Sequence, residues 1–340
     1  MSEKLLEVKD LAVSYFGYAG EVQSVRRVSF DVRKGETVAV VGESGCGKSV
    51  TAKTIMHLIK TPPAKIKEGS QILFNGEDVL QFDKKRLSQY RGGEAAIIFQ
   101  DALAALNPTM TVGKQIAENI RHHSAASKKE ALAQAVELLR MVGIPQPEQR
   151  VKQYPHEFSG GMRQRVMIAI AFACNPQLLI ADEPTTALDV TIQSQIIDLI
   201  KDLQKEKGTS VILITHDLGV VANIAHRIVV MYSGKIVERG DNVSIFHSPR
   251  HPYTNALLEA VPRLDLVNKQ VLSSIEGTPP DLLNPPAGCP FCTRCKYCME
   301  ICCTEEPPAV AFEEGHEASC WLYALAEPCA DAPFTREDRT

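Results

Sequence analysis

The N-terminal part of the chain alternates apolar and polar residues over two stretches, residues 5–15 and 23–32. Because successive side chains of a strand point to opposite faces, this alternation predicts two half-buried β-strands. Shorter runs dominated by apolar residues occupy residues 37–42, 177–184 and 210–217. Runs of that length predict strands that are buried on both faces, which are typical of an α/β domain.

Helical spacing of apolar residues appears between these strands. Residues 126–143 show it clearly, and Ser127 with Glu130 forms a capping-box pattern at the start of that stretch. Residues 191–208 predict a second amphipathic helix, which Gly208 ends. The alternation of strands and helices supports the α/β assignment.

The chain is expected to have one large domain and one small one. Residues 102–173 mix polar and apolar positions, and we expect a helical subdomain there. Residues 227–240 predict a β-hairpin that turns at 233–234. Prolines then accumulate and cysteines follow, so we divide the chain into a main domain, 1–260, and a cysteine-rich extension, 261–340.

The composition excludes several classes of protein. The chain has 340 residues and a formal net charge of −4, so it lacks the basic footprint typical of nucleic-acid-binding proteins. No run of about 18 apolar residues is present, and the first residues lack the apolar core of a secretory signal. We therefore expect a cytosolic protein that binds no nucleic acid and keeps its thiols reduced.

The sequence GESGCGKS, Gly42 to Ser49, fits the phosphate-loop pattern between a strand and a helix. Glycines allow backbone N–H groups to surround phosphates, and the start of the following helix favours an anion. We expect Lys48 to contact the β- and γ-phosphates of ATP and Ser49 to bind Mg²⁺.

The sequence LLIADEP supplies acidic groups for the same chemistry. Asp182 ends an apolar strand, where a buried carboxylate needs a charged partner such as a phosphate-bound metal ion. Glu183 follows directly and is placed to act on water as a general base. Together with the phosphate loop, the pair predicts nucleotide hydrolysis.

A second loop, FSGGMRQR, contains Ser159, Gly160 and Gly161 ahead of a helical stretch. It is another helix start suited to an anion. One nucleotide does not need two such loops from one subunit, so the pattern predicts a dimer that clamps each nucleotide between subunits. Gln100 and His216 end two further apolar runs, at the strand ends where α/β sheets bind ligands.

In this order the motifs resemble the ATP-binding subunits of ABC transporters, over about residues 4–245. The resemblance implies a P-loop NTPase core with an antiparallel β subdomain and a helical subdomain; ALD at 187–189 is similar to the D-loop. The implied catalytic residues are Glu183, His216, Gln100 and Lys48. The implied nucleotide-binding residues are Tyr15 (with Phe16 and Tyr18 as rivals), Gly42, Glu43, Ser44, Gly45, Cys46, Gly47, Lys48, Ser49, Val50, Gln100, Asp182, Ser159, Gly160, Gly161 and Asp189. The implied Mg²⁺ ligands are Ser49, Gln100 and Asp182.

A narrower resemblance concerns residues 154–171, 180–191 and 247–265, which are similar to oligopeptide and dipeptide importer ATPases. It implies an ATPase motor at the cytoplasmic face of the membrane, with di- or oligopeptides as substrates; nickel, glutathione or another small solute stay open. The implied partners are a second ATPase subunit, favoured as a heterodimer, two transmembrane permeases and an extracytoplasmic substrate-binding protein. A soluble ribosome-associated ABC ATPase and a nitrogenase-type reductase are the alternatives from other classes.

The extension concentrates six cysteines between Cys289 and Cys303, at spacings that suit a metal ion or a cluster. A ferredoxin-type spacing joins Cys292, Cys295, Cys298 and Cys302. The peptide-importer resemblance instead implies a 4Fe–4S cluster on Cys289, Cys295, Cys302 and Cys320. Zn²⁺ is the alternative. Because the extension has few apolar residues, we expect that it hardly packs a core of its own and that a bound metal supplies much of its folding energy.

Overall fold

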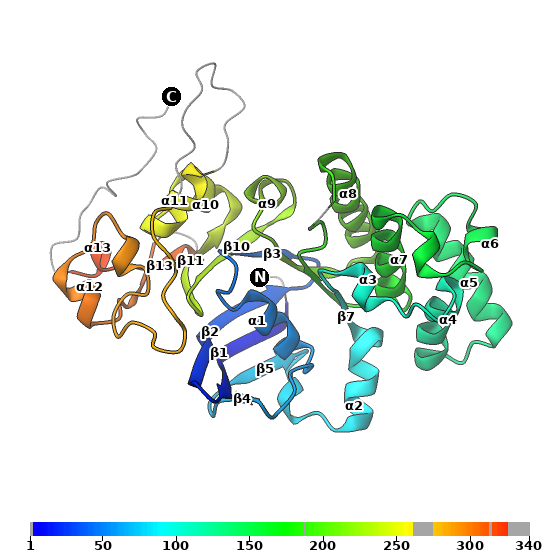
Figure 1. Ribbon diagram of the computed structural model, residues 1–340, viewed down its shortest axis with the longest axis horizontal. Coiled ribbons are helices and arrows are strands. Elements are labelled where there is room, and N and C mark those ends of the chain that lie inside the picture. The colour runs from blue at the N-terminus through cyan, green and yellow to red at the C-terminus, as the bar shows by residue number, and fades with distance from the viewer. Residues whose placement is uncertain (1–2, 187, 261–274, 313–314, 326–340) are drawn as a thin grey trace, which may run out of the picture. The chain divides into compact units, whose positions relative to one another are not determined.

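The apolar runs of the sequence form strands in the computed structural model (Figure 1). The structure describes four stretches of the chain, which are residues 3–186, 188–260, 275–312 and 315–325. The chain divides into two units. The first unit comprises Met1–Leu6, Asp31–Thr37 and Leu73–Ile214. The second unit comprises Glu7–Phe30, Val38–Ile72 and Thr215–Thr340.

In the first unit, three strands form a parallel array. They are β7 (Ala95–Ile98), β8 (Leu178–Asp182) and β9 (Ser210–Ile214), with β8 paired to both neighbours. Every residue of β8 and β9 is buried, as the apolar runs at 177–184 and 210–217 predict. The parallel arrangement brings the carboxyl ends of these strands to one edge of the array, where residue 182 lies.

The helices of the first unit are α2 (Lys84–Gln89), α3 (Ala102–Ala105), α4 (Val112–His123), α5 (Lys128–Met141), α6 (Pro147–Arg150), α7 (Gly160–Phe172) and α8 (Val190–Lys207). The capping box at the start of α5 is confirmed, because Glu130 N donates to Ser127 Oγ and Ser127 N donates to Glu130 Oε2. Gly208 ends α8 with a φ of 68°, the left-handed conformation that glycine adopts without strain. Single 3-10 turns lie at Val79–Gln81 and Pro155–Glu157, and an irregular turn lies at Tyr90–Glu94.

Antiparallel strands make up much of the second unit. The first strands are β1 (Lys4–Gly17), β2 (Gly20–Arg33), β4 (Ala64–Ile66), β5 (Gln71–Phe74) and β6 (Glu77–Asp78), of which β6 and the ends of β1, β2 and β5 fall in the first unit. β4 pairs antiparallel with β1, with Ala64 opposite Tyr15. The alternating stretches at 5–15 and 23–32 thus lie within β1 and β2, as predicted.

A second group of strands surrounds β10 (Arg227–Tyr232), which pairs in parallel with β3 (Thr37–Val41). β11 (Lys235–Asp241) returns antiparallel to β10 through the predicted hairpin. Ser233 and Gly234 both have positive φ, 48° and 79°, as a tight two-residue hairpin turn requires.

The helices described in the second unit are α1 (Lys48–Ile55), α9 (Leu218–Ile224), α10 (Asn242–His247), α11 (Pro252–Glu259), α12 (Glu300–Thr304) and α13 (Trp321–Ala324). A 3-10 turn lies at Cys292–Arg294. Among the residues that the structure describes, no helix is both long and apolar enough to cross a membrane.

The cysteine-rich extension continues the strand group around β10. Its strand β13 (Glu317–Ser319) pairs antiparallel with β11 (Figure 1). β12 (Ala309–Ala311) pairs antiparallel with β13. Its buried Phe291 belongs to the same apolar cluster as Tyr232 and Tyr253. The few apolar side chains of the extension join the core of the preceding strands and helices, and a small cluster of Cys320, Leu322 and Tyr323 packs within the extension itself. That a bound metal supplies much of its folding energy stays a prediction. The boundary near residue 260 stays a prediction, since residues 261–274 lie outside the described ones.

Glu238 on β11 links the extension to the start of α11. Its side chain is 1% exposed, and its carboxylate accepts hydrogen bonds from the backbone N–H groups of Arg250 at 2.6 Å and His251 at 2.9 Å. His316 Nε2 from the extension donates to the same carboxylate at 2.7 Å. Burial lowers the pKa of His251 to about 3, so this ring is neutral, and its Nδ1 accepts the N–H of Tyr253 at the start of α11.

We predict that Glu238→Ala lowers the free energy of unfolding by about 3 kcal/mol, because two buried N–H groups and a ring N–H lose a charged acceptor. Glu306→Ala is the matched control: its ion pairs with Arg26 and Lys235 involve a carboxylate that is 50% exposed, and it should cost less than about 1 kcal/mol. Urea denaturation followed by circular dichroism measures both. Equal midpoints for the two variants would contradict the linking role of Glu238.

Candidate nucleotide site

The phosphate loop lies between β3 and α1 in the second unit and has room for side chains at some positions only. Gly42 has a φ of 150°, and a Cβ there would lie 2.1 Å from the carbonyl oxygen of Met231. Gly47 has a φ of 102°, and its Cβ would lie 2.4 Å from the carbonyl oxygen of Ser24. Glycine is therefore required at both positions by close backbone approach as well as by conformation.

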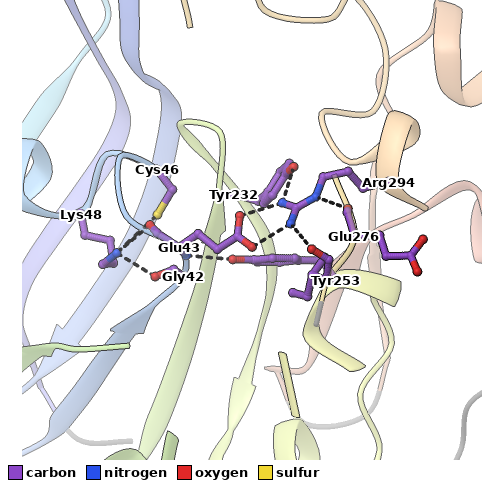
Figure 2. A network of polar contacts seen from close by, with 9 residues as sticks. Gly42, Glu43, Cys46, Lys48, Tyr232, Tyr253, Glu276 and Arg294 are labelled. Carbon is purple, nitrogen blue, oxygen red and sulfur yellow. Dashed lines mark hydrogen bonds and ion pairs between the residues drawn. The ribbon is translucent and has the colours of Figure 1, made fainter. Parts of the chain in front are cut away.

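Lys48 begins α1 and points back into the loop. Its side chain is 5% exposed, and Nζ donates to the carbonyl oxygens of Gly42 at 2.8 Å and Glu43 at 2.9 Å (Figure 2). The ammonium group also lies 3.7 Å from Cys46 Sγ, and burial raises the pKa of that thiol. Cys46 is thus a neutral small residue of the loop, and the positive charge of Lys48 lies inside the loop.

The other loop residues differ in exposure. Ser44 and Gly45 are exposed, whereas Ser49 and Val50 are half-buried at the start of α1. Tyr15, the predicted adenine partner, is half-buried on β1, and burial raises the pKa of its hydroxyl.

The acidic residues of the LLIADEP stretch lie at the end of β8 in the first unit. Asp182 is 3% exposed. Glu183 has a φ of 49°, a conformation that few residues other than glycine adopt, and its N–H donates to Ile214 O at 2.9 Å. Gln100 Nε2 donates to Glu183 Oε2 at 3.0 Å, and the Thr186 hydroxyl donates to the same oxygen at 2.9 Å. Backbone and side chain of Glu183 are therefore both held in place, and Gln100 contacts the general base that the sequence predicts.

The FSGGM loop begins α7 as its sequence predicts. The Ser159 side chain caps the helix by accepting the N–H of Met162 at 3.4 Å. A Cβ on Gly161 would lie 2.8 Å from Ile192 Cγ2, so α7 and α8 pack closely there, whereas at Gly160 the nearest atom would be 3.7 Å away. The close packing fixes the loop against α8.

Asp189 and His216 lie in different settings. The Asp189 carboxylate caps α8 by accepting the N–H of Ile192 at 2.9 Å. Ala187, its predicted D-loop neighbour, lies outside the described residues. His216 follows β9 in the sequence and is exposed.

The cysteines of the extension separate into two groups. One small cavity, with a volume of about 10 Å³, is lined by Cys289, Cys292, Cys295, Cys302 and Cys320. Cys298 instead lies 3.9 Å from Cys303, sulfur to sulfur, and both are exposed. All four thiols implied by the peptide-importer pattern therefore line one cavity, whereas the ferredoxin-type set contributes Cys292, Cys295 and Cys302 but not Cys298.

The charge state of these thiols follows from burial. Burial, and then the neighbouring thiols, raise the pKa of Cys289 and of Cys320 to about 12, so both are protonated at neutral pH. The donor set suits a thiophilic metal, but the cavity has room for about one water molecule. Within the described stretches, no group of three or more His, Cys, Asp or Glu side chains is arranged to hold a metal ion.

Two functional contacts were missed from the sequence, and both concern Glu43. Arg294 of the extension forms a bidentate ion pair with its carboxylate, and Tyr253 Oη accepts its backbone N–H at 2.9 Å (Figure 2). Both residues lie in stretches that the sequence marks, Arg294 among the clustered cysteines and Tyr253 within residues 247–265, but neither stretch indicates a partner.

Two family models match the chain. The model for ABC transporters matches residues 25–186, and the model for the C-terminal region of oligopeptide/dipeptide transporters matches residues 237–302. The oligopeptide transport ATP-binding protein OppD of Bacillus subtilis is 56% identical over 97% of this chain and 92% of its own length. The chain belongs to the ATP-binding subunits of oligopeptide/dipeptide ABC importers. The family predicted from the motifs is thereby confirmed.

Other relatives and solved structures agree with this family. The dipeptide transport ATP-binding protein DppD of Bacillus subtilis is 53% identical over 94% of this chain and 95% of its own length. A dimeric post-hydrolysis structure of the ATP-binding cassette MJ0796 with ADP and Pi superposes with a TM-score of 0.63 at 27% identity, covering 70% of this chain and 98% of that one. The importer subunit therefore has the ABC cassette fold and is the ATPase motor of its transporter, as predicted, rather than a ribosome-associated or nitrogenase-type protein.

We predict that Gly42→Ala weakens ATP binding by the importer subunit by about tenfold or more, because the loop must move away from Met231 and a displacement near 1 Å is costly in a pre-organised site. Gly45→Ala is the matched control: it also has positive φ, 81°, but no atom lies within 4 Å of its Cβ. Equilibrium dialysis with labelled ATP compares the two. A larger loss for Gly45→Ala would contradict the steric argument.

Proposed function

We propose that this subunit drives import of di- or oligopeptides by hydrolysing ATP with Glu183 as the general base. One observation carries the proposal: Glu183 follows a buried strand in a strained conformation, with one carboxylate oxygen held by Gln100 and Thr186. Strain of this kind persists where surrounding structure enforces it and is common at active sites. A carboxylate fixed in this way is suited to orient and deprotonate the attacking water.

The phosphate loop is proposed to bind the ATP phosphates. Lys48 holds its charge against the carbonyl oxygens of Gly42 and Glu43, so ATP phosphates compete with these two acceptors for Nζ. Tyr15 is proposed to stack on adenine, and His216 to contact the γ-phosphate. These groups stabilise charge that develops on the phosphoryl oxygens during hydrolysis.

Mg²⁺ would be held by Ser49, Gln100 and Asp182. Hydroxyl, amide and carboxylate oxygens are the ligands that Mg²⁺ prefers. Asp182 is only 3% exposed, and a bound cation would compensate for the burial of its carboxylate. When bound, the ion neutralises phosphate charge.

The second anion-suited helix start, residues 159–161, supports a role across a dimer. We propose that it contacts the nucleotide of a second ATPase subunit, in a heterodimer at the cytoplasmic face, with two permeases and a substrate-binding protein completing the importer. A related cassette is dimeric in its solved structure. ATP binding would favour the closed dimer, and hydrolysis would reopen it.

We predict that Glu183→Gln slows ATP hydrolysis by the assembled importer by about 10² to 10⁴-fold while ATP binding is retained, because the general base is lost and the phosphate loop is unchanged. Glu137→Gln on α5, an exposed carboxylate, should turn over as the wild type does. Phosphate release and ATP dialysis are measured on the same preparations.

Uptake of labelled peptides into proteoliposomes tests the substrate class. Uptake should require ATP and be lost in Glu183→Gln. Wild-type turnover in that variant would refute the role of Glu183, and ATP-driven uptake of nickel or glutathione in place of peptides would refute the peptide assignment.

A second proposal concerns the cysteines of the extension. We propose that Cys289, Cys295, Cys302 and Cys320 bind a 4Fe–4S cluster with a structural role. The support is that these sulfurs, which come from distant parts of the extension, line one cavity with Cys292. The cavity as described is too small for a cluster, so binding requires the sulfurs to move apart and lose their protons.

We predict that the subunit purified without oxygen contains iron and sulfide in equal amounts, and that Cys320→Ser lowers both because one thiolate ligand is lost. Cys303→Ser is the control, since Cys303 is exposed and lies beside Cys298 rather than the cavity. Metal and sulfide analysis decides the question. Stoichiometric zinc without sulfide, or iron unchanged by Cys320→Ser, would refute the cluster.

A further inference from the structure

The extension reaches the phosphate loop through one arginine. Arg294 lies in the 3-10 turn Cys292–Arg294 and is 4% exposed. Its Nη1 donates to Glu43 Oε2 at 2.7 Å and its Nη2 donates to Glu43 Oε1 at 3.0 Å (Figure 2). The two residues are 251 positions apart in the sequence, so this is a tertiary contact between the extension and the nucleotide site.

Every donor of Arg294 has an acceptor. Besides the two bonds to Glu43, Nη1 donates to Tyr232 Oη at 3.1 Å, Nη2 donates to Ile275 O at 3.0 Å and Nε donates to Glu276 O at 3.0 Å. These bonds use all five N–H groups of a guanidinium. A lysine ammonium cannot reproduce this planar set, so the position specifically requires arginine.

Glu43 is held at three separate points. Arg294 binds its carboxylate, Tyr253 Oη accepts its N–H, and Lys48 Nζ donates to its carbonyl oxygen. The peptide groups on both sides of Glu43 therefore have fixed orientations. A phosphate loop binds anions through oriented N–H groups, so the direction of these peptides bears on its affinity.

The negative charge of Glu43 explains why its side chain is paired with an arginine. Its carboxylate, 25% exposed, lies in a loop that receives a polyanionic ligand. Unpaired, it would repel the ATP phosphates and be free to pull the loop out of shape. Paired with Arg294, the carboxylate is neutralised. The Arg294 guanidinium carbon lies 6.0 Å from the centroid of the Phe291 ring, which packs against the rings of Tyr232 at 5.2 Å and Tyr253 at 5.4 Å.

We propose that Arg294 is a positioning residue of the ATPase, through which the cysteine-rich extension sets the affinity of the phosphate loop for ATP. Arg294 acts through Glu43 and touches no atom that reacts. The inference rests on the role proposed for the phosphate loop and adds the control of that loop by the extension.

A double-mutant cycle on the assembled importer tests the proposal. Arg294→Met should raise the KM for ATP and the Kd for ATP by about tenfold, a typical size for coupling between two sites, with kcat at saturating ATP nearly unchanged because Glu183 is not affected. Adding Glu43→Gln should restore most of the affinity, since the unpaired carboxylate is removed. Arg294→Lys should fall between, because it keeps the charge and loses the planar contacts.

Arg239→Met is the matched control. Arg239 also joins the extension to a preceding strand, through Glu317 and the carbonyl oxygen of Ser29, and contacts no residue of the phosphate loop. If Arg294 had a purely structural role, Arg294→Met and Arg239→Met should have equal midpoints of thermal unfolding and equal KM values for ATP. That result, or additive effects of Arg294→Met and Glu43→Gln, would overturn the inference. If Arg294→Met does not assemble, Arg294→Lys with Glu43→Gln provides the same cycle.

Lys48→Ala separates this inference from the site itself. It should abolish ATP binding in every background, because the loop loses its phosphate-binding charge. Wild-type affinity in Lys48→Ala would refute the phosphate-loop assignment and the inference with it. Loss of binding in Lys48→Ala together with an uncoupled Arg294→Met would refute the inference alone.

Discussion

The close contact between the phosphate loop and the backbone around it constrains the rest of the second unit. A Cβ on Gly42 would lie 2.1 Å from Met231 O on β10, and one on Gly47 would lie 2.4 Å from Ser24 O on β2. The loop can therefore bend only where glycines allow it, and its N–H groups take their directions from two strands. A binding site made of backbone dipoles depends on such fixed directions, because dipoles that must reorient on binding contribute less. The phosphate loop is therefore held in place by the hairpin of β10 and β11 and by the extension.

Elements fixed by neighbouring residues could be predicted from the sequence. The capping box of Ser127 and Glu130 needs residues three apart, and the hairpin turn at Ser233 and Gly234 needs two residues that accept positive φ. The buried strands needed only short apolar runs. The same holds for the nucleotide motifs, since the phosphate binding predicted for GESGCGKS depends on the backbone of the loop itself. The motifs identified the family because their chemistry is local.

Contacts between distant residues could not be predicted in this way. Arg294 looked like one basic residue among cysteines, and nothing local to it indicates that Glu43 is its partner. The extension was underestimated for a related reason: its apolar residues were counted as if they had to form a separate core. Phe291 and Cys302 instead complete a core whose larger part comes from earlier strands and helices. Burial is a property of the assembled fold, and a segment with few apolar residues can be well packed when its neighbours supply the rest.

The ion pair of Arg294 and Glu43 also bears on the cysteines. A partly buried pair offers little net stability compared with apolar packing, and its best-attested benefit is to specify one arrangement over others. Here the ion pair joins the phosphate loop to the turn that contains Cys292 and ends beside Cys295. Coupling between two sites is reciprocal, so an extension that tightens the loop must itself be tightened when ATP is bound, by the same factor. The order of the cysteine segment and the occupancy of the nucleotide site would then report the same conformational equilibrium. A cluster bound to the cysteines would favour the conformation in which Arg294 contacts Glu43.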